Sequence, residues 1–184
     1  MVNSFTSEQA PIKPTIIRYA LIGSLLSLVI TLVGHLTGID TNPDWMIRTS
    51  LLVLTLILFI LVFRSAVLSY RDQENDGSIS FGKGFKITFW ITVIVSLISS
   101  IFLFILLKYM DSAIIDFSLE QAILSMEENG MDEDQIEKNL NLTSKVYTPS
   151  GFAFFGLIVN LFFGCIIALF LSLIYKREAP AKFN

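Results

Sequence analysis

The stretch Thr49–Phe63 reads TSLLVLTLILFILVF and carries no charged residue between Arg48 and Arg64. Unpaired backbone groups are costly in hydrocarbon, so an apolar stretch crosses a bilayer as a helix, whose backbone hydrogen bonds close internally. With their flanks, these residues make a segment of about 22 residues and about 33 Å, enough for a hydrocarbon core of about 30 Å. The two arginines can extend to opposite membrane surfaces. The stretch therefore predicts a transmembrane helix over residues 45–66.

Three further apolar stretches of similar length predict three more transmembrane helices. Charged residues make up 16% of the chain, against about 25% in a soluble domain, and they gather between the apolar stretches. We therefore expect an all-α, integral membrane four-helix bundle that forms a single domain over residues 1–184. The first stretch is too long for a cleaved signal peptide, so we expect it to be retained. The remaining predicted spans are 15–36, 85–107 and 150–175, and the longer loops are 67–84 and 108–149.

The distribution of lysine and arginine predicts how the bundle is oriented. With four spans, both termini and the loop 67–84 share one side, which carries nine basic residues against four on the other side. Basic residues are enriched in cytoplasmic loops, so we expect both termini in the cytoplasm and a location in the cell inner membrane. The nine are Lys13, Arg18, Arg64, Arg71, Lys83, Lys86, Lys176, Arg177 and Lys182; the four are Arg48, Lys108, Lys138 and Lys145.

The predicted outer loop 108–149 contains two amphipathic helical patterns. Ile115, Leu119, Ala122 and Met126 recur at helical spacing, and a second pattern follows over residues 132–147. We therefore expect an extracytoplasmic helical hairpin between the third and fourth spans. Its many acids disfavour binding to anionic lipid. The hairpin either covers the bundle or offers a docking site for a membrane or periplasmic protein partner, and the sequence leaves both open.

Small and weakly polar residues recur every four positions along three of the predicted spans. In a bilayer such residues let helix backbones approach, and their hydroxyl or amide groups can bond across the contact. We expect the first, third and fourth spans to form the tight contacts and the second span to face more lipid. The alternative is that the same residues line a polar path. The packing candidates are Gly23, Ser27, Thr31, Thr92, Ser96, Gly156, Asn160, Gly164 and Ala168.

Asn160 is the one strongly polar side chain well inside a predicted span. An amide left unpaired in hydrocarbon is costly, so we expect Asn160 to bond to a hydroxyl of a neighbouring span or to a backbone carbonyl.

The loop 67–84 resembles a calcium-binding loop only in part. Asp72, Glu74 and Asp76 occupy alternate positions before Gly77, but Lys83 stands where calcium requires a bidentate glutamate. A turn between two helices is the simpler interpretation. One cysteine and one histidine allow no internal disulfide and no His/Cys metal site. We therefore expect no metal, no cofactor and no catalytic residues, and a net charge of −3 without a basic patch argues against a nucleic-acid partner.

Three stretches of the chain resemble a bacterial family known as domain of unknown function 4199, found mainly in Bacteroidota. They are Tyr70-Arg71 with the following Asp76–Phe85, the run Leu157–Leu161, and the close of the last span at Leu173–Arg177. The resemblance implies a small four-span inner-membrane protein and supplies no catalytic residues.

Three functional classes remain open at this point. A non-enzymatic scaffold or modulator of a membrane partner is the first, because the interior of the spans carries no charge and the outer loop is acidic. A subunit of a small oligomeric transporter or channel is the alternative, although proton and ion pathways usually place carboxylates or histidines inside the membrane. Four spans would also need a homo-oligomer to form a pore. An intramembrane enzyme is the least supported, because no hydrolase or metalloprotease motif is present.

Overall fold

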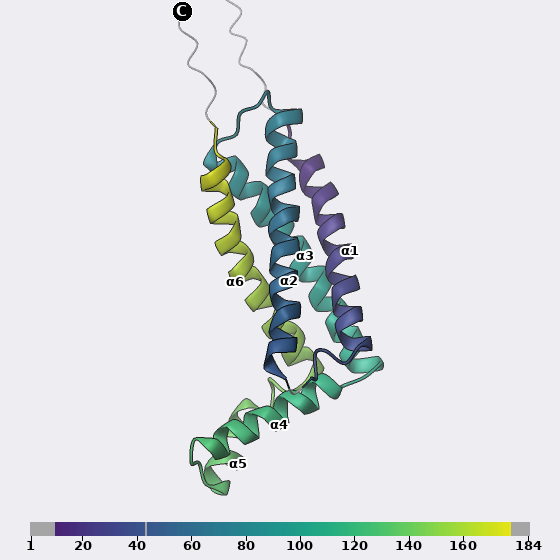
Figure 1. Ribbon diagram of the computed structural model, residues 1–184, viewed down its shortest axis with the longest axis vertical. Coiled ribbons are helices and arrows are strands. Elements are labelled where there is room, and N and C mark those ends of the chain that lie inside the picture. The colour runs from purple at the N-terminus through teal and green to yellow at the C-terminus, as the bar shows by residue number, and fades with distance from the viewer. Residues whose placement is uncertain (1–9, 43, 178–184) are drawn as a thin grey trace, which may run out of the picture.

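The computed structural model describes residues 10–42 and 44–177, and in these ranges the protein is all-helical (Figure 1). Four long helices run alternately up and down, and each is long and apolar enough to cross a membrane. A turn of π-helix, η1, continues α2, and two shorter helices connect α3 to α6. The long helices are α1 (Lys13–Leu36), α2 (Trp45–Ser69), α3 (Phe81–Tyr109) and α6 (Pro149–Tyr175); the short ones are η1 (Tyr70–Glu74), α4 (Ala113–Glu128) and α5 (Glu133–Thr143).

Side-chain caps set where three of the long helices begin. Asp44 accepts a hydrogen bond from the backbone N–H of Met46 at the start of α2, and Thr148 accepts one from Gly151 at the start of α6. Ser80 caps α3, which therefore begins at Phe81 rather than at the predicted position 85. The predicted spans lie inside the observed helices, which extend one to four residues further at most of their ends.

Helix α3 is the centre of the bundle. It packs most extensively against α6 and next against α1, while α2 has the fewest contacts of the four long helices. Of the tight contacts expected among the first, third and fourth spans, those of α3 with α6 and with α1 are present, whereas α1 packs against α2 and not extensively against α6. The fully buried residues of α2 are Phe63, Ala66, Val67 and Ser69, all near its end. The preceding part of α2, from Trp45 to Val62, contributes none.

We call the end of the bundle where α1 begins and α6 ends the terminal end, and the opposite end the hairpin end. The terminal end is closed by the segment between α2 and α3. Ile79 and Arg177 exchange two backbone hydrogen bonds of 2.8 and 2.9 Å in an isolated antiparallel bridge. The fully buried Tyr70 donates its hydroxyl to the carbonyl of Ala10 at 2.6 Å, and Lys83 donates to that same hydroxyl at 3.2 Å. These contacts tie the ends of α1, α2, α3 and α6 together.

The helices α4 and α5 form a hairpin that leads away from the bundle (Figure 1). Ile115 near the start of α4 is buried against Leu106 and Leu107 of α3. In α5 no residue is buried, and its first turn is held by a capping box between Asp132 and Gln135. The hairpin is therefore anchored at the beginning of α4 and exposed over α5.

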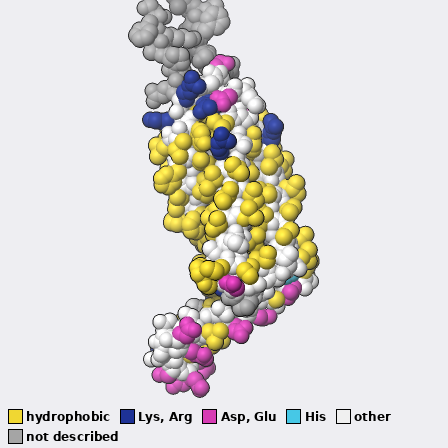
Figure 2. Space-filling model, in the orientation of Figure 1, with side chains coloured by type: hydrophobic (Ala, Val, Ile, Leu, Met, Phe, Trp, Pro, Cys, Tyr) yellow, Lys and Arg dark blue, Asp and Glu magenta, His cyan; other side chains and the backbone are white. Residues whose placement is uncertain are grey.

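Charge is distributed unevenly along the long axis of the molecule. Figure 2 shows lysine and arginine gathered at the terminal end, acids along the hairpin, and a broad apolar band between them. Lys182, which the orientation argument also counts, lies outside the described residues.

Candidate functional site: a cavity between the long helices

The main cavity of the described region lies inside the bundle and has a volume of about 500 Å³. All four long helices contribute to its walls, and Ile114 of α4 borders it at the hairpin end. On α3 the lining runs from Thr92 to Leu103, a depth of about 17 Å at about 1.5 Å per residue. Apart from Phe63, the lining residues of α2 come from the part of this helix that contributes no buried residue.

The side of the cavity between α2 and α6 is open. Leu52 on α2 and Phe163 on α6 both line the cavity and are 58% and 50% exposed. Near the terminal end the gap closes, where Arg64 of α2 donates a hydrogen bond of 3.0 Å to the hydroxyl of Tyr175 on α6. A ligand would therefore reach the cavity laterally, from the bilayer, or from the hairpin end.

Several polar side chains of the lining are already hydrogen-bonded. Thr92 donates to the backbone carbonyl of Thr88 at 2.9 Å, and Thr55 donates to that of Leu51 at 2.8 Å. Ser27 of α1 and Ser99 of α3 share a hydrogen bond of 2.7 Å between their hydroxyls. Because these hydroxyls bond to other groups of the protein, the parts of the cavity wall that they form are largely apolar toward a ligand.

Three other polar side chains of the lining have no hydrogen-bond partner among the described residues: Thr31 of α1, Ser96 of α3 and Asn160 of α6. The bond expected for Asn160 is therefore absent in that part of the chain. The side chain is exposed and lines the cavity.

Two side chains of opposite charge stand at the hairpin end of the cavity. Arg48 lies in the first turn of α2, half-buried, with its guanidinium carbon 4.9 Å from the centre of the Phe117 ring. Asp40 lies in the loop between α1 and α2, over Gly34. Burial raises the pKa of Asp40, and the positive charge of His35 opposes that shift. Within the described residues neither Arg48 nor Asp40 forms an ion pair within 4.0 Å.

The residues named as packing candidates divide between contact surfaces and the cavity. Gly164 is buried against Thr92, where an added methyl group would collide with the Thr92 side chain. Gly23 lies against Val95, and Ala168 is fully buried. Gly156 borders open space, with Leu103 the one neighbour within 4 Å of an added methyl group. Seven of the nine candidates line the cavity: Ser27, Thr31, Thr92, Ser96, Gly156, Asn160 and Gly164.

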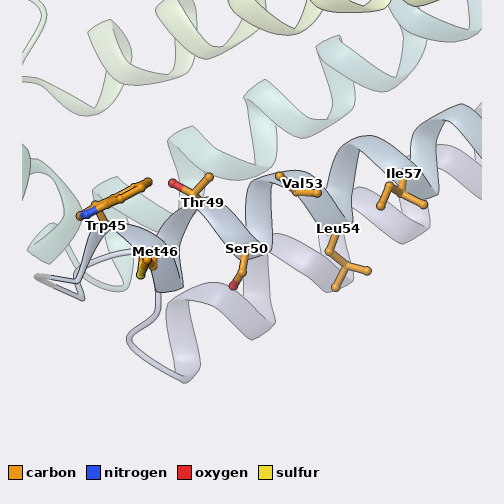
Figure 3. A pocket seen from close by; sticks show the side chains of 7 residues that line it. All are labelled: Trp45, Met46, Thr49, Ser50, Val53, Leu54 and Ile57. Atoms are coloured by element: carbon orange, nitrogen blue, oxygen red, sulfur yellow. The ribbon is translucent and has the colours of Figure 1, made fainter.

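A second depression lies on the surface of α2 and is formed by this one helix. Figure 3 shows its seven lining side chains along α2, from Trp45 to Ile57. Because one helix cannot surround a ligand, this depression is part of the apolar surface that faces the bilayer.

The calcium-like loop uses two of its carboxylates for other contacts. Asp72 accepts two hydrogen bonds from Arg71, at 2.6 and 3.0 Å, and Glu74 accepts one of 2.6 Å from Thr15 of α1. Over residues 10–42 and 44–177, no three side chains of histidine, cysteine, aspartate or glutamate are grouped so that they could hold a metal ion.

Little in the sequence indicates the hairpin end of the cavity, here called its mouth. Arg48 marks the boundary of a predicted span, and no motif predicts that Asp40 lies near the same cavity. Both residues flank the connection between the first two spans, and a pair of opposite charges there is the one signal that could have pointed to a shared site.

The fold and the apolar band define a multi-pass membrane protein, a bundle of four transmembrane helices with an attached helical hairpin. The chain belongs to the family described as "Protein of unknown function (DUF4199)", which it matches over residues 18–177. Comparison with curated proteins and with solved structures found no match. Two of the stretches that carry the family resemblance meet at the terminal end through the Ile79–Arg177 bridge, and the third contains Asn160 in the cavity wall.

Proposed function

We propose that the protein is a non-enzymatic component of the inner membrane that scaffolds or modulates a partner protein through the α4–α5 hairpin. The excess of basic residues at the terminal end supports an orientation with both termini in the cytoplasm and the hairpin outside. The partner is then a periplasmic protein or the outer part of another membrane protein.

The observation that carries the proposal is the incomplete packing of the hairpin. Helix α5 has 11 residues and no buried residue, and a helix of that length is marginal in water without a tertiary partner. Leu142 is 75% exposed and Leu124 is 44% exposed, in a segment that carries eight acidic residues and one lysine. Leu124 lies among Glu120, Glu127 and Glu128, whereas Leu142 lies between Lys138 and Lys145. Exposed apolar side chains in a segment whose charges are mainly negative are suited to a partner with an apolar centre and basic residues at its rim. The acids of the hairpin are Asp116, Glu120, Glu127, Glu128, Asp132, Glu133, Asp134 and Glu137.

Site-specific photo-crosslinking in native membranes tests this proposal. A photoreactive amino acid at Leu142 is expected to give one discrete protein adduct. The matched control is the same amino acid at Phe170 of α6, which is 63% exposed on the apolar band and is expected to react with lipid. Protein adducts of equal yield at both positions would contradict a specific role for the hairpin.

Neutralising the acids distinguishes a specific adduct from random collision. The triple variant Glu133→Gln, Asp134→Asn and Glu137→Gln keeps the Asp132 cap and removes three charges from α5. We expect the Leu142 adduct to fall at least severalfold, and to fall further as salt is raised in the unmodified protein. An adduct that is insensitive to both changes would refute recognition through charge.

The polar lining of the cavity favours a second candidate, a subunit of an oligomeric transporter or channel. Against it, the cavity ends at the apolar cluster that contains Phe63, Ile91, Val95 and Leu171. Ser96→Cys in a Cys165→Ser background tests this candidate. Modification of position 96 by a membrane-impermeant thiol reagent from both sides of the membrane would favour a continuous water path over the scaffold.

A further inference from the structure

We propose that the cavity binds one zwitterionic phospholipid from the leaflet at the hairpin end, with its phosphate on Arg48, its primary amine on Asp40 and one acyl chain between α2 and α6. This site is separate from the exposed face of α5 and does not depend on a protein partner for the hairpin.

The dimensions of the cavity suit one acyl chain. Its depth of about 17 Å along α3 compares with about 15 Å for one leaflet of a hydrocarbon core of about 30 Å. Its volume of about 500 Å³ lies in the range of about 300–1,000 Å³ typical of sites that bind small molecules. The opening between Leu52 and Phe163 faces the apolar band, so a chain can enter sideways without leaving the membrane.

Toward the terminal end, where the acyl chain would lie, the wall of the cavity is apolar. Leu56 and Phe59 of α2, Val95 of α3 and Ile167 of α6 face the space. The hydroxyls of Thr55 and Thr92 bond to their own helix backbones, so contact with a hydrocarbon chain leaves these two donors paired.

The charges at the mouth match a phosphate group and an amine. Arg48 lies three residues into α2, about 5 Å from the start of this membrane-spanning helix, where a guanidinium can extend to the lipid head groups. Its guanidinium stacks on Phe117 and has no acid within 4.0 Å among the described residues, so its edge can donate paired hydrogen bonds to a phosphate. Asp40 borders the same space, which disfavours a head group with a second negative charge and favours one with an ammonium group.

Thr31 fits the same arrangement. It lies five residues before the end of α1, about 8 Å from that end and slightly deeper than Arg48. The ester carbonyls of a phospholipid lie just below its phosphate. The Thr31 hydroxyl, which has no partner in the described part of the chain, can donate to one of them.

Lipid titration followed by native mass spectrometry tests the site. The full-length protein is purified in detergent, stripped of lipid, and titrated with palmitoyl-oleoyl phosphatidylethanolamine or phosphatidylglycerol. We expect one phosphatidylethanolamine per chain to be retained with an affinity at least about tenfold above that for phosphatidylglycerol. Equal retention of the two lipids would overturn the assignment of the amine to Asp40.

Two variants at the mouth locate the head group. Arg48→Gln is expected to weaken retention by about tenfold or more, and Asp40→Asn to remove the preference for the ethanolamine lipid. The matched control is Arg18→Gln on α1, at the terminal end, where an exposed guanidinium also lies over an aromatic ring, that of Tyr19, outside the cavity. Equal losses in Arg48→Gln and Arg18→Gln would overturn the site, as would no loss in either.

A cavity-filling variant tests the acyl chain independently of charge. Gly156→Leu adds a side chain next to open cavity space while Arg48 and Asp40 remain. We expect retention to fall although the protein keeps its helical content by circular dichroism. Unchanged retention in a folded Gly156→Leu protein would show that the chain lies elsewhere and would overturn the proposal.

Discussion

The contact between Gly164 of α6 and Thr92 of α3 predicts a large effect from the smallest side chain. A methyl group at Gly164 would lie 2.8 Å from the Thr92 Oγ1 and 3.1 Å from its Cβ, and closer still to its Cγ2. Thr92 is 3% exposed and its hydroxyl bonds to Thr88, so it has little room to move. Gly164→Ala therefore forces α3 and α6 apart where they cross.

The expected magnitude follows from two opposing contributions. Overpacking a closely packed contact costs about 1–3 kcal/mol. Replacing glycine by alanine inside a helix returns about 0.8–1.0 kcal/mol. We therefore expect Gly164→Ala to lower the free energy of unfolding by up to about 2 kcal/mol, a change in the unfolding constant of up to about 30-fold.

Gly156 provides the control, since it lies on the same helix and a methyl group there meets Leu103 at an ordinary 3.7 Å. Gly156→Ala is expected to be neutral or up to about 1 kcal/mol more stable. Both variants are unfolded by titration with sodium dodecyl sulfate and followed by the fluorescence of Trp45 and Trp90. The reasoning fails if the two variants are equally stable, or if Thr92→Ala does not relieve the Gly164→Ala penalty in the double variant.

Three further predictions concern single side chains and use the same unfolding titration. The Ser24 hydroxyl is buried without a partner in the described region, so Ser24→Ala should raise the free energy of unfolding by about 1 kcal/mol. Ser27→Ala should lower it by about 0.5–1.5 kcal/mol, because the hydrogen bond to Ser99 is lost. The opposite order of stabilities would contradict both assignments. Burial raises the pKa of Asp40 in the folded protein above its ordinary value of 3.8. The folded state therefore favours the protonated carboxyl; this contribution to stability is fully present below pH 3.8 and is lost as the pH rises through the raised pKa. In lipid-free detergent Asp40→Asn should therefore be more stable than the natural protein at pH 7, by a margin that shrinks toward pH 4; a constant margin would refute this cause. Gly77 has a φ of 74° and open space around it, so a side chain there meets backbone strain and no collision. Gly77→Ala should lower the free energy of unfolding by about 1–2 kcal/mol, and Gly77→Asn should lower it less. Equal losses in the two variants would argue against backbone strain.

The helices could be predicted from the sequence because hydrocarbon allows few backbone conformations. In hydrocarbon, an uncharged stretch such as Thr49–Phe63 pairs all its backbone hydrogen-bonding groups by forming a helix. The caps at Asp44 and Thr148 could be predicted because each bonds to a backbone N–H two or three residues further along the chain. The hairpin helices could also be predicted from the sequence, because the exposed α5 and its capping box depend on residues that are close together in the chain.

The site could not be predicted because it depends on how each helix is rotated and on how closely α2 approaches α6. Small residues at intervals of four mark one side of a helix, yet that side can meet another helix, as Gly164 does, or face open space, as Asn160 does. The distinction depends on contacts between segments far apart in the chain. The Ile79–Arg177 bridge is of the same kind, since neither partner has a sequence signal for pairing with the other.

The closure of the terminal end has a mechanical consequence for the bundle. Helix α2 is held firmly near Phe63, Ala66 and Val67, and it is in loose contact toward Trp45. A rod fixed at one end moves most at the other end, so the amplitude of its fluctuations should increase steadily toward Trp45. Changes in bilayer thickness or lateral pressure would then alter the distance between α2 and α6 in one half of the membrane while the other half stays rigid.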